Sequence, residues 1–254
     1  MRRSPELGLR AGNASLCALA ETTLEELQRS AAAENLWLPV DVPAQTTIGE
    51  LAASRDGGPR EARYGRLRDR ILAVEMHGHR FGSEAVKDVA GLDLRRALLG
   101  SEPVAWAVFR LARVPRHRLQ WRAIGGDAFA LADALRADPA APAALVVTAL
   151  DELLIASDHD DSEDARRRRL ITRIAGAHDA ALAPISHHEW VERCAALPAP
   201  RARSTGALAR TAAAVATGDW AFDAGRRLAL GAIASANDRP PPARLVSAVT
   251  AVLR

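Results

Sequence analysis

Prolines and glycines divide the sequence into short segments, and these breaks limit the folds that the chain can adopt. The breaks fall at Gly57-Gly58-Pro59, Pro115, Gly125-Gly126, Pro198-Ala199-Pro200 and Pro240-Pro241-Pro242. Proline lacks a backbone N–H and disfavours helix at the residue before it, so each break favours the end of an element. No apolar segment approaches the ~20 residues that a membrane-spanning helix needs. We therefore expect many short elements and no membrane span.

The composition favours helices in these segments. The chain has 254 residues, of which 55 are alanine and only 4% are aromatic. Alanine is the strongest helix former, and the alternating β-branched and aromatic runs that mark sandwiches and barrels are scarce. Apolar residues recur at helical spacing from Tyr64 through Leu67 and Ile71 to Val74. The strongly apolar stretch 143–156 predicts a helix at the centre of the core.

Capping signals support the same interpretation. A helix is expected over 14–34, and the capping-box pattern of Thr23 and Glu26 within it could equally divide it into two helices. Asp127 precedes a helical segment that ends at Arg136, and Ser186 precedes one that ends at Leu197. The sequence thus predicts an all-α fold, an irregular multi-helix bundle or stack of helical hairpins with about ten helices. We expect one α-helical domain over 1–254, with a subdivision near 198–200 as the alternative. Further helices are expected at 48–54, 60–76, 103–114, 163–182, 204–217, 219–235 and 242–253.

Charge is nearly balanced overall but unevenly distributed. Lysine and arginine total 34 and aspartate and glutamate 31, which gives a net charge of +3 and no general attraction to nucleic acid or membranes. No acidic residue occurs in the segment 103–126. An unneutralised basic segment can contact phosphates or an acidic partner, or its arginines can pair with carboxylates elsewhere, such as those at 158–164. The candidate binding residues are Arg110, Arg113, Arg116, Arg118, Trp121 and Arg122.

An acidic run over 158–164 is the second charged feature. Asp160, Asp161 and Asp164 have the Asp-Asp-x-x-Asp spacing, and hard divalent cations prefer several carboxylate oxygens on one face. These three aspartates are the candidate metal ligands, with His159 or His178 beside them. No second acidic motif follows, however. Acidic residues before a helix also complement the positive end of its dipole, which is the competing explanation.

The sequence lacks the short motifs that mark common catalytic sites. It contains no glycine-rich phosphate loop, no nucleotide-binding fingerprint and no Gly-x-Ser-x-Gly motif, so we expect no cofactor. Cys17 and Cys194 do not make a disulfide scaffold, and no apolar core of signal-peptide length follows Met1. These features predict a cytoplasmic protein.

The function predicted from these patterns is non-catalytic. We expect a helical interaction or adaptor protein that binds another protein, because no catalytic motif stands out. The first alternative is nucleic-acid binding through the acid-free arginine segment 103–126. The second is a metal-dependent helical enzyme centred on the acidic run 158–164.

Overall fold

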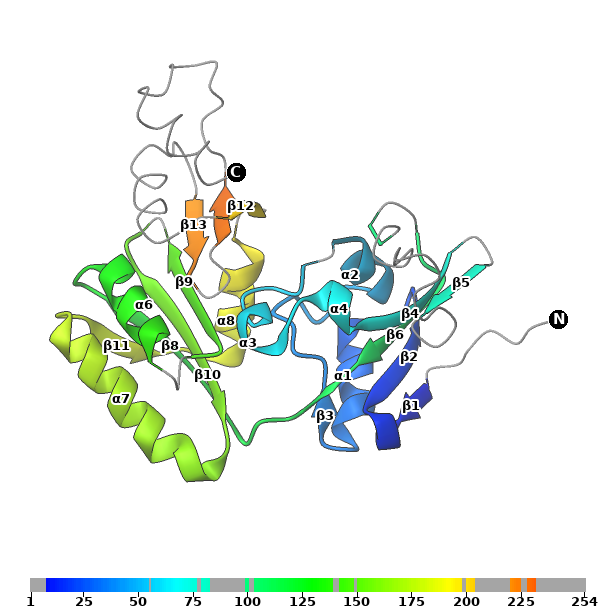
Figure 1. The fold of residues 1–254 in the computed structure, drawn as a ribbon, viewed down its shortest axis with the longest axis horizontal. Helices are drawn as coiled ribbons and strands as arrows, with labels where there is room; N and C mark the ends of the chain where they lie inside the picture. The colour runs from blue at the N-terminus through cyan, green and yellow to red at the C-terminus, as the bar shows by residue number, and fades with distance from the viewer. Residues whose placement is uncertain are drawn as a thin grey trace, which may run out of the picture. The chain divides into compact units, whose positions relative to one another are not determined.

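The computed structural model of the chain describes residues 8–54, 56–76, 79–82, 99–100, 103–138, 142–148, 150–197, 200–203, 220–224 and 228–231. The chain divides into two compact units, unit 1 over Met1–Pro115 and unit 2 over Arg116–Arg254. Both units contain sheets as well as helices (Figure 1). Among the described residues, no helix is long and apolar enough to span a membrane.

Unit 1 is built on a five-stranded antiparallel sheet in the order β1-β2-β6-β4-β5, with a separate two-stranded ladder of β3 and β7. The strands are β1 (Gly8–Arg10), β2 (Ser15–Leu19), β3 (Leu36–Trp37), β4 (Ile71–Met76), β5 (His79–Gly82), β6 (Trp106–Arg110) and β7 (Ala112–Arg113). The helical elements are η1 (Ala11–Asn13), α1 (Leu24–Ala32), α2 (Ile48–Ser54), α3 (Glu61–Tyr64) and α4 (Leu67–Arg70).

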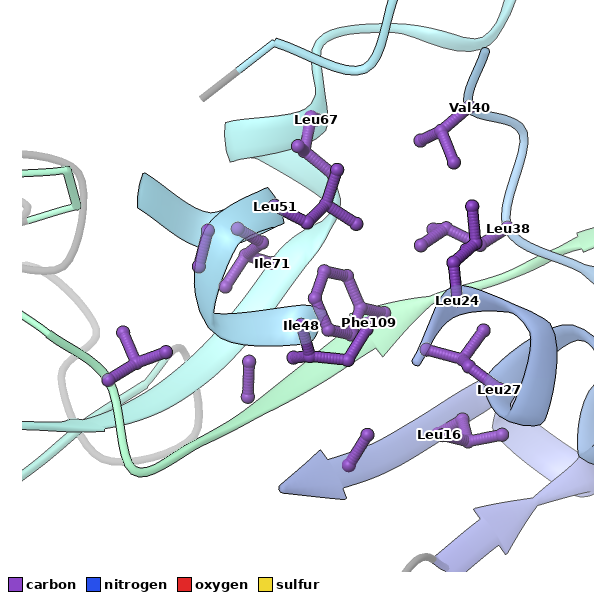
Figure 2. Close-up of a cluster of buried hydrophobic side chains, with 14 of the residues drawn as sticks. Leu16, Leu24, Leu27, Leu38, Val40, Ile48, Leu51, Leu67, Ile71 and Phe109 are labelled. Carbon is purple, nitrogen blue, oxygen red and sulfur yellow. The ribbon is translucent and has the colours of Figure 1, made fainter. Parts of the chain in front are cut away.

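One face of the five-stranded sheet carries the core of unit 1. Leu16 on β2 and Phe109 on β6 are fully buried, and they belong to the same cluster as residues of α1 and α2 (Figure 2). The irregular segment after β3 adds Leu38 and Val40 to this cluster. Removal of this apolar surface from water is the main force that holds the segment against the sheet.

Unit 2 is built on a seven-stranded antiparallel sheet in the order β11-β8-β10-β9-β13-β14-β12. The strands are β8 (His117–Ile124), β9 (Ala144–Thr148), β10 (Leu153–His159), β11 (Ala181–Pro184), β12 (Pro200–Arg203), β13 (Trp220–Asp223) and β14 (Leu228–Gly231). The helical elements are α6 (Ala128–Ala137), η2 (Asp161–Glu163), α7 (Asp164–Ala177) and α8 (His187–Ala195).

Helices cover both faces of the sheet of unit 2. Residues of α6 and α7 pack against Leu153 and Ile155 of β10 on one face (Figure 1). Trp190 of α8 packs against Leu154 and Ala156, which lie on the opposite face because successive strand residues alternate. Strand β10 is therefore buried along its whole length.

The predicted all-α fold is wrong, and the apolar stretch 143–156 shows why. It forms the hairpin of β9 and β10 rather than one helix, with Asp151 at a positive φ of 56° in the connection. A strand covered on both faces is continuously apolar, and its pattern cannot be told from that of a buried helix. The expected helices at 14–34, 60–76, 103–114 and 219–235 likewise contain strands: β2 in the first, β4 in the second, β6 with β7 in the third, and β13 with β14 in the fourth.

The local capping predictions are confirmed. Thr23 and Glu26 form a capping box at the start of α1, Asp127 accepts a hydrogen bond from the Ala130 amide, and Ser186 caps α8. The expected helix at 48–54 matches α2. The expected helices at 204–217 and 242–253 lie outside the described residues. The two units divide after Pro115. The sequence places the alternative subdivision near 198–200, and of these residues 198 and 199 are not described.

Candidate functional site

A cluster of two histidines and two aspartates lies at one end of the sheet of unit 2. The antiparallel register places His159, the last residue of β10, opposite His117, the first residue of β8. Their imidazole rings stack with centroids 5.5 Å apart and an interplanar angle of 21°. The acidic segment that follows β10 brings Asp161 and Asp164 back to these rings. Pairing of β8 with β10 thus brings the histidine that begins β8 together with the acidic segment that follows β10.

Each histidine of this cluster binds a different carboxylate. His117 Nε2 lies 2.8 Å from Asp161 Oδ1, and His159 Nε2 lies 2.9 Å from Asp164 Oδ1. His117 Nδ1 is 3.9 Å from Asp164 Oδ1, which links the two pairs. The His159 side chain is fully buried, whereas those of His117 and Asp161 are 31% and 57% exposed. The His117–Asp161 pair is therefore the accessible half of the cluster.

Arginines hold both carboxylates in their charged forms. Arg116 donates to Asp161 Oδ2, and Arg168 Nε donates to both oxygens of Asp164 at 2.9 and 3.0 Å. Hydrogen bonds with His117 and Arg116 lower the pKa of Asp161, and those with His159 and Arg168 lower the pKa of Asp164. The cluster therefore keeps two ionised carboxylates beside two imidazoles.

Ser157, His159 and Asp164 have the connectivity of a catalytic triad but not its exposure. Ser157 Oγ is 3.3 Å from His159 Nδ1, and His159 Nε2 binds Asp164 as described above. A nucleophilic serine must reach a substrate carbonyl. Ser157 is fully buried on the helix-covered strand β10, so this chain of hydrogen bonds stabilises the fold and the orientation of His159.

The predicted arginine site is divided by the structure. Arg110 and Arg113 are exposed on β6 and β7 of unit 1, whereas Arg116, Arg118 and Arg122 belong to unit 2. Trp121 of β8 packs against the cluster under α6 and α7, on the face opposite to Arg118 and Arg122.

Several of these arginines pair with carboxylates. Arg116 binds Asp161, and Arg122 binds Glu152 at 3.4 Å. The alternation of polar and apolar residues from Arg118 to Ala123 is the sequence signal that could have identified β8 and placed Arg118 and Arg122 on one strand face.

The predicted metal ligands do not form a metal centre among the described residues. In this part of the chain, no group of three or more histidine, cysteine, aspartate or glutamate side chains could hold a metal ion. Asp161 and Asp164 bind histidines and arginines instead. Asp160 is exposed and precedes η2, where its carbonyl accepts from the Glu163 amide at 3.1 Å. His178 ends α7 and is not part of the cluster.

A glycine-containing turn in unit 1 is the second notable feature. It covers Gly57-Gly58-Pro59-Arg60, and three carboxylates lie on it. The Gly57 amide donates to Glu61 Oε1 at 2.9 Å, the Gly58 amide to Asp56 Oδ1 at 2.9 Å, and the Arg60 amide to Asp41 Oδ2 at 2.8 Å. Glu61 Oε1 also accepts from the Leu67 amide at 2.7 Å. The turn is therefore held by acidic side chains.

Comparisons with known proteins connect the chain to enzymes. No protein-family model matches it. A mitochondrial D-lactate dehydrogenase (cytochrome) of Arabidopsis thaliana is 32% identical over 91 residues, which cover 32% of this chain and 16% of the relative. Two solved structures of alkyldihydroxyacetonephosphate synthase are similar at 16% identity, with TM-scores of 0.59 and 0.60. Those likenesses cover 77% of this chain but only 47% and 44% of the synthase chains.

These findings correct two predictions. The fold is a mixed α/β fold like that of the alkyldihydroxyacetonephosphate synthase structures, and not the all-α fold that the sequence predicts. The prediction of a non-catalytic adaptor is wrong, because the similar proteins are enzymes. The chain spans less than half of the solved synthases and about a sixth of the dehydrogenase.

Proposed function

We propose that this chain is a component of an oxidoreductase that oxidises a small 2-hydroxy acid, with D-lactate as the first substrate to test. The observation that carries the proposal is the 32% identity with a D-lactate dehydrogenase over 91 residues. The fold, which resembles that of FAD-binding oxidoreductases, supports the same reaction class. Fold likeness alone would leave the substrate open, because one fold hosts many reactions.

A 2-hydroxy acid presents two groups that a protein must recognise. Its carboxylate suits an arginine, which binds such groups through charge-assisted hydrogen bonds. Its hydroxyl loses a proton on oxidation to the ketone, and histidine is the most common side chain to accept one. The carbon-bound hydrogen leaves with the electron pair, for which an acceptor is required. Among the described residues, recognition groups of both kinds lie side by side as Arg116 and His117.

Asp161 supports this assignment because its carboxylate already binds both groups. Arg116 and His117 each contact one of its two oxygens, and the side chains of Arg116 and Asp161 are 72% and 57% exposed. We infer that a substrate carboxylate binds Arg116 in place of Asp161, with its hydroxyl directed to His117. Ion pairs as exposed as this one contribute little to stability, so exchange of one carboxylate for another costs little.

The fold implies an FAD cofactor, and the described residues of unit 1 do not fit its diphosphate. The backbone amides of the glycine-containing turn already donate to carboxylates, which would repel a diphosphate. We therefore assign no described residue of unit 1 to the binding of the electron acceptor.

The proposal is tested on the protein with its natural partners. The tagged full chain is purified from the host that produces it, and reduction of an artificial dye is followed with D-lactate, L-lactate and other 2-hydroxy acids. We expect dye reduction with at least one 2-hydroxy acid and none with the matching acids that lack the hydroxyl group. Absence of reduction with every 2-hydroxy acid, with FAD added, would show that the proposed reaction is wrong.

A further inference from the structure

We propose that the exposed side of α7 binds a second copy of this chain, at the acidic surface formed by the starts of α1 and α2. On α7 the contact consists of an arginine stripe, Arg166, Arg169 and Arg173. On the second copy it consists of an acidic pair, Glu26 and Glu50. The inference does not depend on the proposed function, since neither surface includes a residue assigned to the substrate.

The arginine stripe follows one side of α7. Positions 166, 169 and 173 are three and four residues apart, so their side chains are neighbours along one line of the helix surface. Other residues of α7, among them Ile171 and Ala175, are buried against the sheet. The side chains of Arg166, Arg169 and Arg173 are exposed, and in the described part of the chain none of them has a hydrogen bond or an ion pair.

This arrangement of charge is unfavourable for the helix by itself. Arg169 repels Arg166 three residues before it and Arg173 four residues after it, because like charges at these spacings lie side by side. Arg166 is also in the first turn, where the positive end of the helix dipole disfavours a cation. Arg168 of the same helix, by contrast, pairs with Asp164. Carboxylates of a partner would relieve the repulsion within the stripe.

The acidic pair is fixed in place by two capping boxes. The Thr23 amide donates to Glu26 Oε2 at 2.9 Å, and the Thr47 amide donates to Glu50 Oε2 at 2.8 Å. Thr23 and Thr47 form an isolated antiparallel bridge. The backbone hydrogen bonds that flank this bridge make them a non-hydrogen-bonded pair, whose Cα atoms lie about 4.5 Å apart. The two carboxylates are therefore held by adjacent threonines.

Both glutamates of the acidic pair are exposed and ionised. Hydrogen bonds from the capping threonines lower the pKa of Glu26 and the pKa of Glu50. The nearby guanidinium of Arg29 forms its ion pair with Glu25, at 2.8 Å. The starts of α1 and α2 thus present two negative charges next to each other, which favours a cationic partner.

The stripe and the acidic pair match in charge and in spacing. An α-helix rises 1.5 Å per residue, so Arg166 and Arg169 are about 4.5 Å apart along the axis of α7. This equals the separation of the two capping threonines, and arginine binds carboxylates through charge-assisted hydrogen bonds. In a two-fold dimer the contact is reciprocal and therefore occurs twice.

A membrane surface fits the stripe less well. Helices that lie on membranes insert large apolar side chains between the lipids. Among the described residues, the exposed large apolar side chains are Ile124 and Leu150, and neither belongs to α7. A second copy, in contrast, supplies the matching carboxylates itself.

Self-association of the purified full chain is measured by sedimentation velocity. The chain is loaded from about 1 μM to about 1 mM, because contacts between exposed charges are individually weak. Ionic strengths of about 0.01 M and about 1 M are compared, between which the Debye length falls from about 30 Å to about 3 Å. We expect a concentration-dependent shift from monomer to dimer at low ionic strength, and an association constant at least about tenfold smaller at high ionic strength.

Two charge-reversed variants locate the contact. Arg166→Glu with Arg169→Glu reverses the stripe, and Glu26→Lys with Glu50→Lys reverses the acidic pair. Each variant alone should associate at least about tenfold more weakly than the natural chain, because like charges then face each other. An equimolar mixture of the two variants should form a heterodimer, because each stripe then meets a pair of opposite charge.

Two further variants serve as controls. Arg110→Glu with Arg113→Glu makes the same change in net charge as reversal of the stripe, at exposed arginines of unit 1, and should associate like the natural chain. Glu26→Gln with Glu50→Gln removes the negative charges but keeps residues that complete a capping box. It should also associate more weakly, with little change in the thermal unfolding midpoint.

A natural chain that stays monomeric at every concentration and low ionic strength overturns the proposal. So does a mixture of the two reversed variants that fails to associate, or a control at Arg110 and Arg113 that weakens association as much as reversal of the stripe. Binding of a DNA duplex through the stripe by a chain that remains monomeric would assign a different occupant and also overturn it. None of these results bears on the dye-reduction assay, so the two proposals fail separately.

Discussion

Asp41 and Arg60 form an ion pair in which neither side chain has any exposed surface. The Arg60 backbone amide also donates to Asp41 at 2.8 Å, and the guanidinium lies 5.7 Å from the centre of the Trp37 ring. Asp41 follows β3 and Arg60 ends the glycine-containing turn, so the pair fixes two irregular segments of unit 1 against each other.

Removal of one partner of this pair should destabilise the protein strongly. Asp41→Asn or Arg60→Met leaves the other charge buried without a counter-ion, which typically costs about 3–5 kcal/mol. We expect each single variant to lower the free energy of urea unfolding by this amount. The double variant should lose less than the sum of the two, because it leaves no isolated charge. Additive losses would contradict a direct interaction.

Gly58 should tolerate alanine poorly for two separable reasons. Its φ is +88°, and a Cβ there would lie 2.7 Å from the Asp41 Cβ. Gly65 has a similar φ of +83° but no atom within 4 Å of the added Cβ. Gly65→Ala should therefore cost only the backbone strain, about 1–2 kcal/mol, and Gly58→Ala more than that. Thermal and urea unfolding of both variants measure the difference, and equal losses would show that the close contact does not matter.

Acid should weaken unit 2 through Asp164. Its pKa in the folded protein is lowered by hydrogen bonds with His159 and Arg168. The resulting stabilisation is complete above the unfolded pKa of about 3.9 and is lost as the pH falls from there through the lower folded value. We expect Asp164→Asn to be less stable than the natural protein at neutral pH, with a gap that narrows below about pH 4. Urea unfolding at several pH values tests this, and a gap that is constant with pH would contradict it.

Arg116 should act on substrate affinity if it binds the substrate carboxylate. Arg116→Ala removes one charge-assisted hydrogen bond, so KM for the 2-hydroxy acid should rise by about tenfold or more. Asp161→Asn should lower KM, because it weakens the competing internal carboxylate. Arg136→Ala removes a different ion pair of unit 2, with Asp133, and is the matched control. Dye-linked kinetics of the native assembly measure all three, and an unchanged KM in Arg116→Ala would exclude the assignment.

Short-range signals of the sequence predicted the ends of several helices correctly. A capping box such as Thr23 with Glu26, or a cap such as Asp127 or Ser186, depends on residues within one turn, so the sequence contains all that is needed. Strands depend on distant partners. Ala144 and Ala156 lie opposite each other in a buried sheet, although alanine by itself favours helix. The scarcity of aromatic residues was therefore a poor reason to exclude sheets.

The candidate site shows the same limit. The sequence singled out Arg116 and Asp161 separately, in the acid-free segment and in the acidic run. The register that pairs His117 with His159 brings these two segments together. From the sequence alone, a contact between Arg116 and Asp161 is one of several possible arginine–carboxylate pairings, because it depends on β8 and β10 being neighbours in the sheet. His117 lies within the arginine segment but outside the predicted binding residues, and its partner Asp161 lies in the acidic run.

We propose that the chain belongs to an assembly that transfers electrons from a 2-hydroxy acid to a flavin. The most direct test is anaerobic addition of D-lactate to the assembly purified through this chain, while flavin absorbance is recorded. We expect loss of the oxidised-flavin absorbance with D-lactate, or with another 2-hydroxy acid, and no change with propionate, which lacks the hydroxyl group. A preparation whose flavin is reduced by dithionite but by none of the 2-hydroxy acids would contradict it.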